Sequence, residues 1–116
     1  MVSFGAVVVE DGLGREFYGQ LRPISDDYIP GALKVSGFSR EETLAFPEPK
    51  EVMDSFKKWL GGLGDGRLMF VSDNNGFDWQ FVNWYFHHFT GTSMNSTLYQ
   101  LMKCVSADFQ IRIRTL

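Results

Sequence analysis

The chain is poor in the residues that hold small secreted domains and zinc modules together. Its 116 residues include one cysteine, Cys104, and two histidines. One cysteine can form neither an internal disulfide nor a thiolate zinc cluster, so we expect a reducing compartment, by default the cytoplasm. The sequence also lacks an apolar run long enough for a membrane span and a basic segment ahead of an apolar core, so we expect no membrane partner.

Basic residues are scarce as well. Eleven Lys and Arg stand against fourteen Asp and Glu, which gives a net charge of -3 and a pI of about 5.2. No broad basic surface for nucleic acid is therefore indicated, and any such binding has to be local or metal-mediated. With 44% apolar residues, the length suits one domain over residues 1–116 and is too short for two.

Apolar patterning divides most of the chain into strands and helices. Residues 2–9, VSFGAVVV, are nearly continuously apolar, which predicts a buried strand, and the alternation over 15–23 predicts the second arm of a hairpin. Helical spacing begins at Lys50, a short apolar strand is predicted over 67–72, and a helix over 77–89 follows. This order predicts an α/β domain with helices packed on a mixed sheet.

Residues 24–49 form a crossing segment with two short helical signals. One lies around 30–35, and the other is a capping-box pattern of Ser39 and Glu42. The apolar residues of this segment are expected to be covered, as in a structured loop. They are Tyr28, Ile29, Leu33, Val35 and Phe38. In the tail, residues 96–104 suit a helix, and FQIRIRTL alternates like a strand.

The stretch SDNNGFDW, residues 72–79, places the acid Asp78 in the first turn of the helix predicted over 77–89. That helix is apolar nearly all round, so we expect it to be largely buried. A buried carboxylate is costly unless it is paired. Its partner can be a metal ion, in keeping with catalysis, or the helix N-terminus, where the macrodipole favours an acid. Asn74 and Asn75 are ordinary turn formers.

A wider pattern surrounds this acid. FVSDNNGFDWQF, residues 70–81, resembles the second motif of the DEDD group of 3′–5′ exonucleases, with Asp78 as the motif carboxylate. Upstream, MVSFGAVVV, EFYGQLRP and IPGALKVSGFSREE resemble the second strand, third strand and connecting loop of RNase T and DNA polymerase III proofreading domains. The resemblance runs in order over residues 1–90, whereas the tail, 91–116, diverges. It implies an RNase H-like fold that lacks its first strand.

The resemblance also implies a site and its ligands. Asp78 would be the catalytic and metal-binding acid, and a loop over 30–38 would lie near the terminal nucleotide. The substrate-binding residues would be Asn74, Phe77, Ser36 and Gly37. The family holds two Mg or Mn ions with clustered carboxylates and acts on single-stranded DNA or RNA at the 3′ end. Because no Asp-x-Glu pair is found here, we expect an impaired or inactive, truncated or rearranged member.

One alternative function stays open, a non-catalytic α/β module that keeps the fold for protein contacts. Trp79, Phe81 and Trp84 are expected to be core residues more often than base-stacking platforms.

The missing first strand would leave a gap between the strands at 2–9 and 67–72. We expect it to be closed by direct pairing of these strands, by the C-terminal strand, or by a second chain in a homodimer, because an unpaired edge is unfavourable.

Overall fold

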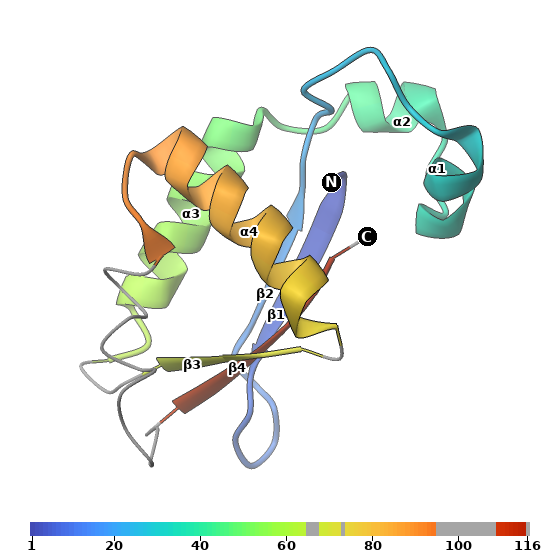
Figure 1. Ribbon diagram of the computed structural model, residues 1–116. Helices are drawn as coiled ribbons and strands as arrows, with labels where there is room; N and C mark the ends of the chain where they lie inside the picture. The colour runs from blue at the N-terminus through green and yellow to red at the C-terminus, as the bar shows by residue number, and fades with distance from the viewer. Residues whose placement is uncertain (65–67, 73, 95–108, 116) are drawn as a thin grey trace.

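The computed structural model describes residues 1–64, 68–72, 74–94 and 109–115 (Figure 1). Over these residues the chain forms four strands and four helices in an α/β arrangement. The helix predicted over 96–104 lies outside the described residues. None of the helices in the described part has an apolar stretch long enough to cross a membrane.

The four strands form one mixed sheet in the order β2-β1-β4-β3. The strands β1 (Ser3–Val8) and β2 (Glu16–Gln20) make the predicted antiparallel hairpin. The other two are β3 (Leu68–Val71) and β4 (Phe109–Thr115), which run parallel to each other, whereas β4 is antiparallel to β1. The predicted mixed sheet is therefore confirmed.

The strand β4 occupies the position between β1 and β3, where the sequence predicted a gap. Phe4 stands opposite Thr115 and Val8 opposite Ile111, while Phe70 on the other side is also opposite Ile111. This is one of the three outcomes stated for the gap: the C-terminal strand fills the sheet position within the chain. Its pairing satisfies backbone groups of both neighbours that would otherwise be unpaired. Homodimerisation stays a prediction, but the gap on which it rested is closed within the chain.

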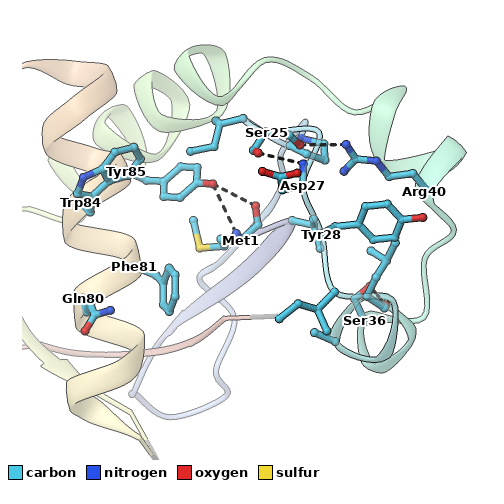
Figure 2. A pocket seen from close by; sticks show the side chains of 16 residues that line it. Met1, Ser25, Asp27, Tyr28, Ser36, Arg40, Gln80, Phe81, Trp84 and Tyr85 are labelled. Carbon is cyan, nitrogen blue, oxygen red and sulfur yellow. Dashed lines mark hydrogen bonds between the residues drawn. The ribbon is translucent and has the colours of Figure 1, made fainter.

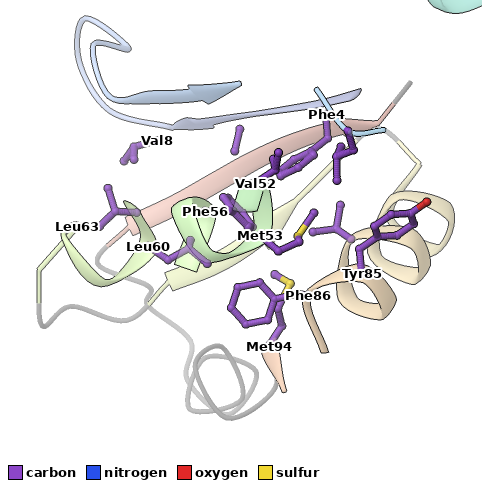
Figure 3. Close-up of a cluster of buried hydrophobic side chains, with 13 residues drawn as sticks. Phe4, Val8, Val52, Met53, Phe56, Leu60, Leu63, Tyr85, Phe86 and Met94 are labelled. Atoms are coloured by element: carbon purple, nitrogen blue, oxygen red, sulfur yellow. The ribbon is translucent and has the colours of Figure 1, made fainter. Parts of the chain in front are cut away.

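The helices α3 (Pro49–Gly61) and α4 (Asn75–Thr90) lie side by side on one face of the sheet (Figure 1). The core lies between them and β1, and Figure 3 shows its side chains. Its members are Phe4, Ala6, Val8, Leu21, Val52, Met53, Phe56, Leu60, Leu63, Val82, Tyr85, Phe86 and Met94. The alternation 4, 6, 8 on β1 shows that one face of this strand meets the helices.

A glycine allows α3 to approach the hairpin closely. A Cβ atom at Gly19 would lie 2.7 Å from Val52 Cγ1 and 2.9 Å from Phe4 Cε1. Val52 and the rings of Phe4 and Phe17 occupy the space that this glycine leaves. Phe56 of α3 packs edge-on against Phe4 at a centroid distance of 5.0 Å. The helical spacing predicted from Lys50 onward is confirmed, because Val52, Phe56 and Leu60 are buried on one side of α3.

The two short helices, α1 (Pro30–Ser36) and α2 (Arg40–Leu44), stand apart from this core (Figure 1). The predicted capping box is present, since Ser39 Oγ accepts from the Glu42 N–H and the Glu42 carboxylate accepts from the Ser39 N–H. The predicted cover is wrong for part of the segment. Ile29 is 74% exposed and Val35 78% exposed, because the described residues place no core layer over α1.

The expectation that α4 is largely buried is also wrong in part. Val82, Tyr85 and Phe86 face the core, whereas Phe77 is 52% exposed and Trp84 47% exposed. Only one side of α4 packs against α3 and β4, so the opposite side of this apolar helix has no described neighbour to cover it fully. Two large aromatic side chains are therefore presented to solvent.

Candidate functional site

Asp78 lies in the first turn of α4, a few residues beyond the end of β3. It is 6% exposed, and its Oδ2 accepts a hydrogen bond of 2.6 Å from Ser72 Oγ. The same hydroxyl accepts from the Asn74 N–H at 3.1 Å. The carboxylate is therefore satisfied by a hydroxyl and lies at the positive end of the helix dipole.

The position of Asp78 in the sheet is one at which α/β proteins bind ligands. β3 and β4 are parallel, and Asp78 follows the carboxyl end of β3, while α4 packs on β4. In open α/β sheets, ligands bind in the crevice outside the carboxyl ends of parallel strands. Asp78 is thus a buried acid beside the edge where such a crevice is expected.

A cavity of about 610 Å³ opens along α4 and is here called the α4 cleft. Figure 2 shows α4 side chains on one side of it and the segment leading into α1 on the other. The residues that line it include Tyr28, Ser36, Arg40, Gln80, Phe81, Trp84 and Tyr85. Its volume falls within the range of small-molecule sites in proteins.

The structure brings some of the predicted site residues to this cleft. Ser36 lines it, and the Phe77 ring contacts that of Phe81, which also lines it, at a centroid distance of 4.8 Å. Asn74 precedes α4 as its N-cap, and Gly37 ends α1 in a left-handed conformation with φ of 79°. Neither of these two is among the cleft residues. Asp78 is not a lining residue either, but it lies one turn from Phe81 on α4.

Sequence reasoning missed the cationic side of the cleft. The guanidinium of Arg40 lies 4.8 Å from the centre of the Tyr28 ring and donates to the Ser25 carbonyl at 2.9 Å. Asp26 approaches it at 3.8 Å. Arg40 was visible in the sequence only as a residue within the capping-box helix, and nothing there signalled its stacking on a ring 12 residues earlier.

A second polar contact closes the inner end of the cleft. The Tyr85 hydroxyl lies 3.5 Å from the Met1 amino group and 3.5 Å from the Met1 carbonyl (Figure 2). Burial raises the pKa of Tyr85 and lowers that of the Met1 amino group. Desolvation is the cause in both cases, because it disfavours whichever form is charged.

The described residues do not fit a two-metal centre. Among them, no group of three or more His, Cys, Asp or Glu side chains is placed to hold a metal ion. Asp78 belongs to no such group among the described residues, and one of its oxygens accepts a hydrogen bond from Ser72 Oγ. Asp73 and Asp108 lie outside the described residues. A hard divalent cation needs several oxygen ligands, so these residues alone supply too few.

The chain resembles a known nuclease in sequence. No protein-family model matches it. It is 38% identical over 94 residues to the 3′–5′ DNA exonuclease Cap18 of Escherichia coli, and the match covers 78% of this chain. The chain spans about half the length of this relative, because the match covers 50% of it. This likeness confirms the predicted relationship to a 3′–5′ exonuclease.

Proposed function

We propose that this chain is a 3′–5′ exonuclease-like domain of the DEDD type, with an RNase H-like fold, that binds the 3′ end of single-stranded nucleic acid in the α4 cleft. The observation that carries the proposal is the buried first-turn acid Asp78 beside the carboxyl edge of a parallel strand pair. The relative's name supports it and makes DNA the first substrate to test.

The side chains of the α4 cleft suit a nucleotide. Phe81 and Trp84 offer ring faces on which bases can stack, which is how many proteins hold single strands without reading sequence. Arg40 supplies a cation for a phosphate, and Gln80 supplies an amide that donates and accepts hydrogen bonds. The Ser36 hydroxyl already donates to the Leu33 carbonyl, so it can serve a ligand only as an acceptor. The net charge of -3 makes such local contacts more important than a broad basic surface.

Hydrolysis is the part of the family's function that the described residues do not support. In the related enzymes two Mg or Mn ions would supply the activated water and stabilise the leaving oxygen. The described part of the chain contains no group of three or more His, Cys, Asp or Glu side chains that could hold such an ion. We therefore propose that this chain retains binding of the 3′ end, while its cleavage of nucleic acid is weak or absent.

Binding can be measured apart from cleavage by fluorescence anisotropy in EDTA. A 5′-labelled single-stranded oligonucleotide with a free 3′ end should bind more tightly than the same sequence with its 3′ end in a blunt duplex. Phe81→Ala should weaken binding by about tenfold, the loss expected for one stacked base. Tyr18→Ala is the matched control, because Tyr18 is an exposed aromatic residue outside the cleft. Equal loss in both variants, or no binding by the parent, would contradict the proposal.

Metal and activity are tested separately. Calorimetry should show only very weak Mn²⁺ binding, little changed by Asp78→Asn, because a lone carboxylate cannot displace the hydration shell. A labelled oligonucleotide should stay intact in Mg²⁺. A stoichiometric micromolar site lost in Asp78→Asn, or 3′ shortening that EDTA abolishes, would show that acids beyond the described residues complete the centre.

A protein-interaction module is the second candidate function. The exposed apolar side chains at Ile29, Val35, Phe77 and Trp84 favour it, since a protein partner would cover them. The anisotropy experiment distinguishes the two. Absence of any oligonucleotide binding by a folded protein would leave this candidate as the better one.

A further inference from the structure

A second pocket of about 550 Å³ lies beside the α4 cleft. The two cavities are neighbours, because they share three lining residues, Pro23, Ile24 and Trp84. The second pocket adds a cation, an acid and a further ring, from Arg22, Glu48 and His88. It is here called the His88 pocket. None of the predicted site residues lines it.

The wall of the His88 pocket contains two stacked rings. Trp84 and His88 are one turn apart on α4, with centroids 4.7 Å apart and ring planes only 9° from parallel. Phe89 meets His88 edge-on at 4.8 Å and so limits the movement of the imidazole. Trp84 is nevertheless 47% exposed. A preorganised, partly exposed ring stack is suited to extending onto a third flat ring, such as a nucleobase.

The pocket is also lined by Arg22, a cation that is paired with Glu48 and could bind a phosphate in its place. Arg22 Nη1 lies 3.0 Å from Glu48 Oε1, and both side chains are substantially exposed. Exposed ion pairs contribute little to stability, so separating this one costs little. A phosphate is a strong partner for a guanidinium, through two parallel hydrogen bonds. Glu48 would then compete with the phosphate and repel it.

The two cavities are arranged along α4 in a line that suits an extended ligand. The exposed ring of Phe77 is near one end of this line and His88 is near the other. At 1.5 Å per residue, the rise along α4 from Phe77 to His88 is about 16 Å. A stacked strand rises about 3.4 Å per nucleotide, so roughly five nucleotides match this length. A mononucleotide in the α4 cleft would leave His88 uncovered, because His88 does not line that cleft.

We propose that Trp84, His88 and Arg22 form a second nucleotide subsite, which takes a nucleotide on the 5′ side of the one held in the α4 cleft. One base stacks on the Trp84 and His88 rings, and its phosphate binds Arg22 in place of Glu48. The strand then runs along α4 from Asp78 toward the C-terminal end of the helix. This inference rests on the proposed binding of single strands and adds the direction and length of the bound segment.

The test compares short and longer strands in EDTA, with 5′-labelled dT2 and dT6 as probes. His88→Ala and Arg22→Gln should each weaken dT6 binding by about tenfold and leave dT2 binding within about twofold. Glu48→Gln should tighten dT6 binding. Arg22→Gln should also reduce the salt dependence of log K by about 0.7, the value for one single-strand phosphate contact.

Two control variants are matched to these changes. His87→Ala removes the neighbouring imidazole, which is exposed but outside both cavities, and Lys58→Gln removes an exposed cation of α3. Neither should change dT6 binding by more than about twofold at constant salt. Trp84→Phe should retain more dT6 affinity than Trp84→Ala, because phenylalanine preserves a stacking face.

The outcomes separate the two proposals. If the parent binds dT6 more tightly than dT2 and the His88 and Arg22 variants lose only dT6, the subsite is supported. If those variants bind dT6 as the parent does, the subsite is overturned while the proposed function stands. If the folded parent binds neither strand, both are overturned.

Discussion

The helices α1 and α3 have similar local signals but different environments. Both begin with proline in their first turn, and both have a basic residue in the last turn. However, five residues of α3 are buried, four of them in the core, whereas none of the α1 residues is buried in the described structure. Local signals are therefore enough to begin and end a helix here, but they do not determine how strongly the rest of the fold holds it.

The difference matters because α1 lies at the proposed site. Ser36 on α1 lines the α4 cleft, as do residues of the segment that precedes the helix. Elements with little apolar burial open locally at low free energy, and ligand-binding segments are commonly of this kind. We expect α3 to hold the fold together and α1 to gain contacts when a strand is bound.

The largest effect expected from this comparison is on the free energy of unfolding. Phe56→Ala should lower it by about 3–5 kcal/mol, because a fully buried ring in contact with Phe4 and Phe86 leaves a cavity. Val35→Ala on α1 should change it by less than about 0.5 kcal/mol, since that side chain is mostly exposed. Urea unfolding measures both. A loss above 2 kcal/mol for Val35→Ala would show that α1 is covered in solution.

Two glycines give a second, smaller contrast. Gly19→Ala should destabilise the fold by about 1–3 kcal/mol through overpacking against Val52 and Phe4. Gly37→Ala should cost about 1 kcal/mol of strain at a positive φ, with no steric clash. Thermal unfolding compares them. The Gly37 change should also weaken oligonucleotide binding, because Gly37 ends the helix that contributes Ser36 to the cleft. Equal stability of Gly19→Ala and the parent would show that β2 and α3 can move apart.

Much of the fold was predictable from periodicity. The hairpin, α3, β3 and α4 were all predicted from the length and spacing of apolar runs. The strand at 109–115 was also predicted, and its place between β1 and β3 was one of three stated outcomes. Strand order could not be fixed in advance, because backbone pairing carries no local sequence signal.

The site was less predictable. Asp78 was identified from a resemblance that covers the residues around it, and its first-turn position was read correctly. The exposure of Trp84 was not predicted, because hydropathy cannot distinguish an aromatic residue in the core from one at the surface. The stack on His88 depends on side-chain geometry one turn away, which spacing permits but does not specify.

The smallest expected effect concerns pH and the capping box of α2, a helix held mainly by local contacts. Hydrogen bonds from the Ser39 backbone N–H, and then from its side chain, lower the pKa of Glu42 from its ordinary value of 4.5. Because the folded pKa is lower than the unfolded one, the stabilisation is present above about pH 4.5 and is lost as the pH falls through the folded pKa. Carboxyl NMR should show Glu42 titrating below its ordinary value, and Ser39→Ala should raise its pKa only part of the way back, since the backbone donor remains. Glu42→Gln should remove this contribution to the acid dependence of α2. An unshifted Glu42 would mean that the capping box is open in solution, and that α2 as well as α1 lacks the firm support that the core gives to α3.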